Sequence, residues 1–270
     1  MLVLMETGRL FLMPNKNSTI QHSSSSIHLF VNGFSFCTPS KTEFVPLTEN
    51  IEDFKSTLKD LLLFYPKSTF TQTQIVCYHQ PSTFVPKAFF DKKLLSNYVK
   101  FLGALDAHSA LNYDELEEEK QVNVYSYPKT VLEILNQNLE NATFCHYNSL
   151  LYREVTSLAA SSNKKQHLFV HLQKGAMDLY LCENSTVIFQ NHFSIQNEDE
   201  FLYYVFFVVE QYKLSTADFE IVFLGKITAF ESYYRGINEY HDFIRFETSK
   251  TSSLLIMDQH PAPFFAQLFS

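Results

Sequence analysis

Thiol and imidazole side chains are the groups in this sequence best suited to nucleophilic or metal chemistry. The four cysteines, Cys37, Cys77, Cys145 and Cys182, lie far apart, and none has a second cysteine at the Cys-x-x-Cys spacing of zinc sites. Cys145 is adjacent to His146, but neighbouring residues of a strand point to opposite faces, so the two do not form a nucleophile and base pair. We therefore expect four buried free thiols, as is typical of a reducing compartment.

Carboxylates next to histidines form a second group of candidates. His241-Asp242 and Asp258 to Pro261 combine acid and imidazole groups, but at no spacing typical of a metal cluster, and surface or capping roles are expected. The acidic segment Asp114 to Glu119 is interpreted as a solvated loop or helix edge, because like charges at this density repel. Asp178 is an alternative metal ligand within a predicted strand, and an exposed strand-face position is the default.

Glycine lets a loop approach phosphate groups closely, and it is scarce here, at 6 of 270 residues. The phosphate-binding loop motif and the Gly-x-Ser-x-Gly hydrolase motif are both absent from the sequence. The formal net charge of −8 gives no general attraction to nucleic acid or to anionic lipid. Composition thus disfavours a nucleic-acid partner and the commonest nucleotide-binding classes.

The sequence shows no pattern typical of membrane insertion or secretion. Its strongest apolar run, Phe201 to Val209, is far shorter than the roughly 20 residues that cross a bilayer, and it predicts a buried helix. The segment Met1 to Met13 lacks the basic start and continuous apolar run of a signal peptide. We expect a cytoplasmic protein with no membrane partner.

Hydrophobic periodicity predicts the elements that position these side chains. A polar segment, Pro14 to Ser26, precedes a strand at Ile27 to Val31, a tight turn at Asn32-Gly33 and a returning strand at Phe34 to Thr38. The further predicted elements of this half are a strand at Lys41 to Leu47, a helix from Ile51 to near Pro66, a strand at Gln74 to His79, a helical pattern over Lys87 to Leu105, a strand at Gln121 to Tyr127, a helix over Thr130 to Leu139, a strand at Thr143 to Tyr147 and a helix over Leu150 to Ala160.

The same order of elements then begins again. His28-Leu29-Phe30-Val31 recurs letter for letter as His167-Leu168-Phe169-Val170, and each copy opens a hairpin. The second hairpin continues through Gly175 to Cys182 and Val187 to His192, and a helix over Glu198 to Tyr212 follows. A final strand, Glu220 to Phe223, matches Gln74 to Cys77 in the first half. We expect His28 and His167 to occupy matching strand edges.

Two copies of a strand-strand-strand-helix-strand unit predict an α/β protein with mixed sheets covered by helices. The polar stretch Ser161 to Lys165 is the best candidate boundary between them. The predicted organisation is a flexible N-terminal segment at 1–26, a first domain at 27–163 and a second domain at 164–270.

This duplicated unit resembles the actin-like ATPase fold, which consists of paired ribonuclease-H-like domains. The stretch Ser26 to Cys37 is similar to the opening of an uncharacterised bacterial family, domain of unknown function 3822, whose members are described as having that fold. The resemblance covers the chain from Ile27 onward. It implies a fold of two tandem actin-like domains and no established activity.

Actin-like ATPases carry Asp-x-Gly followed by Ser or Thr at the end of the first strand of each domain, and the resemblance allows these positions to be compared. Aligned on Gly33, after Asn32, the first half has Val31 in place of the aspartate and Phe34 in place of the hydroxyl residue. The second half lacks the carboxylate before Gly175, where Lys174 is the residue that can meet a phosphate.

The adenosine-contacting region of such folds is rich in glycine, whereas this chain offers only Gly225, followed by Lys226. The six degenerate nucleotide positions are thus Asn32, Gly33, Lys174, Gly175, Gly225 and Lys226. We expect no catalytic residues, no metal site and no cofactor.

These observations favour a non-catalytic actin-like protein that has lost ATP hydrolysis and acts as a protein-binding or scaffolding module. One alternative is a divergent ATPase or kinase that binds ATP and Mg²⁺ between the domains, and another is a small-molecule sensor that uses the same cleft. Aromatic segments at Tyr233-Tyr234, Phe243 to Phe246 and Phe264 to Phe269 are candidates either for docking a partner or for filling the core.

Overall fold

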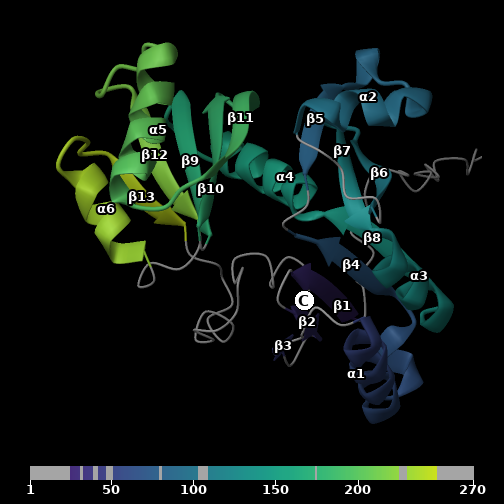
Figure 1. The fold of residues 1–270 in the computed structure, drawn as a ribbon. Coiled ribbons are helices and arrows are strands. Elements are labelled where there is room, and N and C mark those ends of the chain that lie inside the picture. Colours follow the sequence, from purple (N-terminus) through teal and green to yellow (C-terminus); the bar gives the residue numbers. More distant parts are fainter. Residues whose placement is uncertain are drawn as a thin grey trace, which may run out of the picture.

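The computed structural model describes residues 25–30, 33–38, 42–46, 51–78, 81–102, 109–173, 175–224 and 230–247. Within these ranges the chain forms two five-stranded sheets and one three-stranded sheet, with helices between and outside them (Figure 1). No helix in this described part is both long enough and apolar enough to cross a bilayer.

The first large sheet is an antiparallel meander extended by two parallel strands. Its order is β3-β2-β1-β4-β8, in which β1 pairs antiparallel with β2 and parallel with β4. Its elements are β1 (Ser25–Phe30), β2 (Gly33–Cys37), β3 (Thr42–Pro46), β4 (Thr73–Cys77) and β8 (Ala142–His146), with helices α1 (Ile51–Phe64) and α3 (Lys129–Asn138). The first strand therefore begins at Ser25, slightly before the predicted start at Ile27.

The second large sheet repeats this arrangement with the order β11-β10-β9-β12-β13. Its elements are β9 (Gln166–Gln173), β10 (Ala176–Glu183), β11 (Thr186–Ser194), β12 (Phe219–Leu224) and β13 (Ile244–Glu247), with helices α5 (Glu198–Gln211) and α6 (Glu231–Asn238). Here β9 pairs antiparallel with β10 and parallel with β12, as β1 does with β2 and β4. The matching orders confirm the predicted α/β class with mixed sheets, while the division of the chain at residues 163 and 164 stays a prediction.

The segment between β4 and β8 differs most from the prediction. The expected long helix over Lys87 to Leu105 is wrong. That stretch holds the short helix α2 (Leu95–Val99) and 3-10 turns at Lys87–Phe89, Lys92–Leu94 and Lys100–Leu102; a further 3-10 turn lies at Lys67–Phe70. Helix α2 packs against a three-stranded sheet of order β5-β7-β6, formed by β5 (Ser82–Pro86), β6 (Ser109–Leu116) and β7 (Gln121–Pro128). Leu95, Tyr98 and Val99 pack on that small sheet, whereas Phe89 and Phe101 are exposed, so the stretch has no single buried face that would support a continuous helix.

The two copies of the His-Leu-Phe-Val repeat do not occupy equivalent positions in the two sheets. Val76 of β4 pairs with His28, whereas the corresponding Val222 of β12 pairs with Phe169, so His28 matches Phe169 and not His167. Both histidines are buried on the central strands β1 and β9, which corrects their expected placement at strand edges. The equivalence of the two halves thus rests on sheet order.

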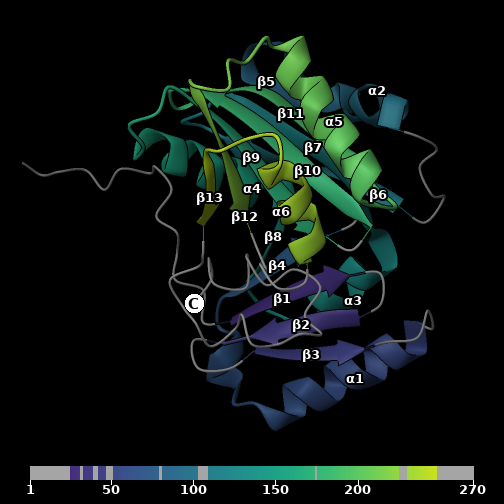
Figure 2. The same ribbon diagram turned by 90° about the vertical axis from the view of Figure 1, so that its left-hand side faces the viewer.

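Each sheet buries one face under its own pair of helices. Helix α1 lies along the first sheet (Figure 2). Its residues Phe54, Leu58 and Leu61 recur at helical spacing and pack with residues of β1, β2 and α3. In the second half, Phe201, Val205 and Val208 of α5 pack in the same way on β9, β10 and β12.

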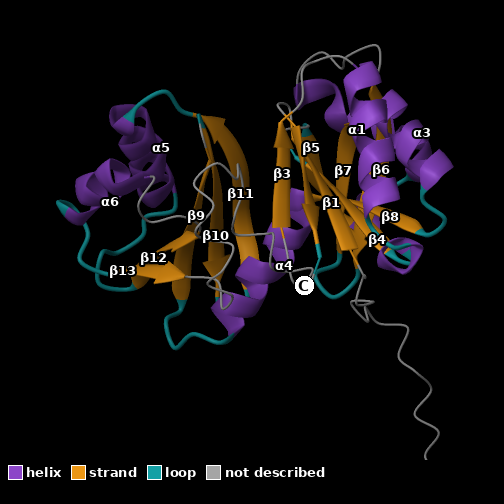
Figure 3. Cartoon of the chain, turned by 90° about the horizontal axis from the view of Figure 1, so that it is seen from below, coloured by secondary structure: helices purple, strands orange, loops and turns teal. Residues whose placement is uncertain are grey.

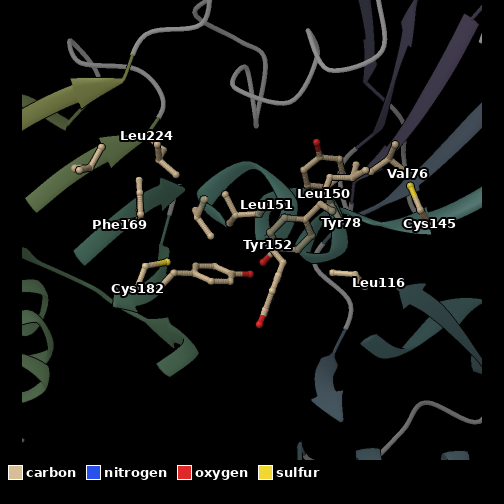
Figure 4. Packing of buried hydrophobic residues seen from close by; sticks show 14 of the residues in the cluster. Val76, Tyr78, Leu116, Cys145, Leu150, Leu151, Tyr152, Phe169, Cys182 and Leu224 are labelled. Carbon is tan, nitrogen blue, oxygen red and sulfur yellow. The ribbon is translucent and has the colours of Figure 1, made fainter. Parts of the chain in front are cut away.

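The inner faces of the two sheets share a single helix, α4 (Tyr147–Ala160), which lies between them (Figure 3). Leu151, Tyr152 and Val155 of α4 belong to one cluster with residues of both sheets (Figure 4). The other members of this cluster include Phe30, Val76 and Tyr78 from the first sheet and Phe169, Tyr180, Cys182, Val222 and Leu224 from the second. A continuous apolar core therefore joins the two halves of the molecule.

Candidate functional site at the start of helix α4

Polar side chains collect where the second hairpin faces the first turn of α4. Side chains alternate along a strand, so His171 and Gln173 of β9 lie on the α4 side of the sheet together with Phe169, while Leu172 lies under α5. Asp178 of β10 pairs with His171 across the ladder and lies on the same face. All three polar side chains are buried, and Asp178 is 0% exposed.

Four hydrogen bonds surround the Asp178 carboxylate. Its Oδ1 accepts from Tyr147 OH at 3.0 Å and from His192 Nδ1 at 2.7 Å. Its Oδ2 accepts from His171 Nδ1 at 3.0 Å and from Gln173 Nε2 at 2.9 Å. An ionised carboxylate has about four lone-pair acceptor sites, and here all of them are occupied from within the chain.

This environment fixes the charge of the cluster. Burial by itself raises the pKa of Asp178, but the hydrogen bonds and charges of His171 and His192 outweigh it and hold that pKa well below its usual range. Burial acts to lower the pKa of His192, and the hydrogen bond to Asp178 and its charge raise it above 6.5 overall. Asp178 is therefore an anionic acceptor whose oxygens are held by hydrogen bonds from two histidines, and it is not a free general base.

Tyr147, the first residue of α4, joins this cluster to the first half of the molecule. Burial raises the pKa of its hydroxyl well above 10, so the group is a neutral hydrogen-bond donor at neutral pH. Asn148 follows, and it donates from Nδ2 to Ser82 Oγ of β5 while its Oδ1 accepts from Tyr180 OH of β10. Two consecutive residues of one helix thus bridge both halves of the chain.

A second carboxylate, Asp114 of β6, lies at the N-terminus of the same helix. It accepts from the backbone N–H of His146 at 2.8 Å, from Ser149 Oγ at 2.5 Å and from Tyr125 OH at 3.0 Å. Anions are stabilised at this end of a helix, where backbone N–H groups lack intrahelical partners. Burial nevertheless raises the pKa of Asp114 to about 6. The interpretation of this acidic segment as a loop or helix edge is therefore wrong for Asp114, which lies on a strand.

Gly33 and Gly175 are the two predicted nucleotide positions within the described residues. Gly33 has a φ of +155°, and a Cβ there would lie 2.3 Å from the backbone oxygen of Val45, so close packing of β2 on β3 requires glycine. Gly175 has a φ of +76° at the tip of the second hairpin, with open space around it. The other four positions, Asn32, Lys174, Gly225 and Lys226, lie outside the described residues.

Strand registers show what the first half has in place of the Asp178 cluster. With His28 equivalent to Phe169, the pair Phe30 and Gly33 corresponds to His171 and Asp178. The first hairpin thus has a phenyl ring and a glycine where the second has an imidazole and a carboxylate. The two halves share a fold but differ in chemistry at equivalent positions.

Sequence reasoning missed most of this site. The exposed placement expected for Asp178 is wrong, because its partners come from β9, β11 and α4, which are far apart in the sequence. The one local signal is that His167, His171 and Gln173, three polar residues, share one face of an otherwise apolar strand, with Phe169 between the first two. A polar row on a buried strand face indicates internal partners.

The other chemical candidates form no cluster among the described residues. All four cysteines are buried free thiols, as predicted, and burial raises the pKa of Cys77 to about 12. His241 is buried against the ring of Phe219, with ring centroids 4.3 Å apart, which replaces its expected surface or capping role. In the described part of the chain no group of three or more ligating side chains is arranged to hold a metal ion. The segments Asp258 to Pro261 and Phe264 to Phe269 lie outside the described residues.

Solved structures with the same fold include two that span nearly this whole chain. A Bacteroides thetaiotaomicron protein with an actin-like ATPase fold and unknown function has 16% identity and a TM-score of 0.70, over 84% of this chain and 91% of that chain. The PilM-PilN type IV pilus biogenesis complex contains a chain with 10% identity and a TM-score of 0.55, over 90% of this chain and 96% of that chain. These similarities show that the chain has an actin-like ATPase fold.

No curated protein sequence is significantly similar to this chain. The family model described as protein of unknown function, DUF3822, matches residues 15–244, which include β1 and the start of β13. The chain therefore belongs to the DUF3822 family.

Proposed function

We propose that this protein is a non-hydrolysing actin-like module of the cytoplasm that binds another protein. The main observation in favour of lost hydrolysis concerns Asp178, a buried carboxylate close to the tip of the second hairpin. Hydrogen bonds from within the chain already occupy both of its oxygens. A metal-bound phosphate site needs carboxylate oxygens that are free to take Mg²⁺ or its water. Both oxygens of Asp178 already accept two hydrogen bonds each.

Two further features support this proposal. At the position equivalent to Asp178 the first half has Gly33, so the described strands of the first hairpin offer no matching carboxylate. The apolar cluster around Leu151 also continues from one sheet to the other through α4. Domain closure around a nucleotide would have to shear this core, and large apolar interfaces oppose such motion.

The protein-binding part of the proposal rests on exposed rings and on one fold relative. Tyr203 and Phe207 of α5 are 63% and 47% exposed, which is unusual for neighbouring aromatic residues of one helix. The PilM-PilN structure, by its name, is a complex of two proteins in type IV pilus biogenesis. A related fold thus occurs in a protein assembly, and we carry that mode of action to this chain as part of the proposal.

A small-molecule sensor is the second candidate, and one atom favours it. Gln173 Oε1 is buried and has no hydrogen-bond partner among the described residues. A buried acceptor of this kind is usually paired with a protein group, a water molecule or a ligand. Binding of an uncharged metabolite beside the second hairpin would use this acceptor without any hydrolysis.

Nucleotide titration of the full chain tests the proposal. Thermal unfolding is followed with ATP, ADP or GTP, each with and without Mg²⁺, and calorimetry measures any heat of binding. A ligand at 100 times its dissociation constant stabilises the native state by about 2.7 kcal/mol, which is readily visible as a shift in melting temperature. We expect no shift at millimolar nucleotide.

The control variants decide how a positive result is interpreted. A Mg²⁺-dependent shift that Lys174→Ala or Lys226→Ala removes, and that Lys59→Ala on helix α1 retains, would establish the divergent ATPase or kinase instead. A shift with an uncharged metabolite that Gln173→Leu removes would establish the sensor.

A further inference from the structure

Helix α5 has two apolar faces, and the described part of the chain covers one of them. Phe201, Val205 and Val208 point into the second core and are almost completely buried. Tyr203 and Phe207 are four residues apart on another face, and their rings stack with centroids 6.2 Å apart. The predicted buried helix over this run is therefore wrong for one of its faces, which points to solvent.

These exposed rings line a groove with a volume of about 390 Å³. Its lining consists of Asp199, Leu202, Tyr203, Phe206, Phe207, Glu210 and Tyr240. Tyr240, in the turn after α6, is 61% exposed and meets Phe206 edge to face, with ring centroids 5.2 Å apart. Side chains of α5 thus form one side of the groove, and Tyr240 forms part of the other.

The length of the groove fits another helix. Its lining residues run from Asp199 to Glu210 on α5, which at 1.5 Å per residue is about 16 Å, or three turns. Residues 3 or 4 apart on a partner helix would meet the aromatic floor along this length, as in known helix-in-groove complexes. An extended peptide of the same length would bring fewer side chains to that floor.

Charge defines the ends of the groove. Asp199 lies near the start of α5 and Glu210 near its end, with the aromatic residues between them, and the seven lining residues include no lysine or arginine. Two acidic ends favour a partner with a basic residue at each end of its apolar stripe. They disfavour a second copy of this chain, with its net charge of −8, and they disfavour an anionic membrane.

We propose that the α5 groove binds an amphipathic helix of about three turns from another protein, with lysine or arginine at both ends of its apolar stripe. This inference rests on the protein-binding function proposed above and specifies the partner's chemistry. Tyr203 and Phe207 provide the central apolar contact, because aromatic side chains dominate binding energy at interfaces. Asp199 and Glu210 set the register of the bound helix.

A displayed library of 16-residue helical peptides tests this proposal on the full-length protein. The library carries apolar residues at helical spacing and random acidic, basic or neutral residues at the flanks. We expect selection to enrich peptides with basic residues at both flanks. Enrichment of acidic flanks, of proline-containing extended peptides, or of no peptide at all would overturn the proposal.

Affinity of a selected peptide is then measured through a tryptophan placed in it, because this chain contains no tryptophan. Tyr203→Ser combined with Phe207→Ser should weaken binding by at least about tenfold, as expected for central aromatic contacts. Asp199→Asn with Glu210→Gln should weaken binding several-fold and reduce its dependence on salt. Phe101→Ser removes an aromatic residue that is 84% exposed in the first half of the molecule, and it should leave the affinity unchanged.

Three results would contradict the groove assignment. One is equal affinity for the wild type and the Tyr203→Ser, Phe207→Ser variant, and another is an equal loss with Phe101→Ser. A third is concentration-dependent dimerisation, or binding to vesicles with phosphatidylglycerol, that the paired serine variant abolishes, since this would assign the face to a second copy or to lipid. A negative nucleotide titration together with any of these would leave the non-hydrolysing fold in place and remove only the groove.

Discussion

Helices α4 and α5 have equal length and opposite relations to their surroundings. Each has 14 residues, and α5 is the more apolar, with the run Phe201 to Val209 at its centre. Yet α4 has eight buried residues, including the polar Asn148 and Ser149, whereas α5 has three. Two sheets enclose α4, while one sheet covers α5 (Figure 1). Burial is thus decided by position in the fold. The apolar side chains of α5 that the described fold leaves exposed are the basis for the proposed binding of another protein there.

The largest expected effect comes from truncating the buried face of α4. Leu151 is 0% exposed and lies in the cluster that joins both sheets, so Leu151→Ala should lower the free energy of unfolding by about 2–5 kcal/mol through lost contacts and a cavity. Urea unfolding followed by circular dichroism measures this loss. A loss below about 1 kcal/mol would mean that the two halves are not held together through α4.

The polar end of α4 offers a second test, which depends on pH. The pKa of His192 is raised in the folded protein by Asp178, so between the unfolded value of about 6.5 and the higher folded value the native state binds more protons. The contribution of His192 to the free energy of unfolding is fully present below about pH 6.5, and it is lost as pH rises through the folded pKa. We expect the free energy of unfolding to fall over this window, and His192→Asn, which keeps a donor for Asp178, should flatten the fall.

Asp178 and Tyr147, which contact each other beside His192, do not titrate in this window. Asp178 has a lowered pKa, so its contribution is lost only as pH falls below about 4, and the raised pKa of Tyr147 keeps its hydroxyl neutral. Asp114, at the N-terminus of α4, has a pKa of about 6 in the folded protein, so its titration changes the free energy of unfolding between about pH 4 and 6. Because the His192 side chain is 44% exposed, solvent screens the effect, which should be smaller than that of Leu151→Ala. Identical pH slopes for wild type and His192→Asn would exclude the ion pair.

The order of elements could be predicted from the sequence because hydrophobic periodicity is a local property. The helix predicted over Glu198 to Tyr212 and the strand over Glu220 to Phe223 lie within one or two residues of α5 and β12. The stretch Lys87 to Leu105 could not be assigned correctly, since it packs on a small sheet formed by the strands that flank it, which the sequence pattern does not assign together. Periodicity predicts a helix or strand well where the whole element packs on one neighbour, and less well where several neighbours compete.

The candidate site depends on contacts that spacing does not encode. Asp178 has bonded partners in β9, β11 and α4, and the match of His28 to Phe169 follows from strand register alone. Composition likewise indicated apolar character for α5 without indicating which face would remain open. Both features depend on how the elements pack in space, which no local pattern specifies.

The smallest expected effect concerns the exposed face of α5 and completes the comparison with α4. Tyr203 and Phe207 are exposed in the folded chain, so replacing both with serine should change the free energy of unfolding by about 0.5 kcal/mol or less, in contrast to Leu151→Ala. Urea unfolding under identical conditions measures both variants. A loss as large as that of Leu151→Ala would place these rings in the core of the protein itself. Near-neutral stability together with weakened peptide binding would mean that these rings contact a partner and contribute little to the fold itself.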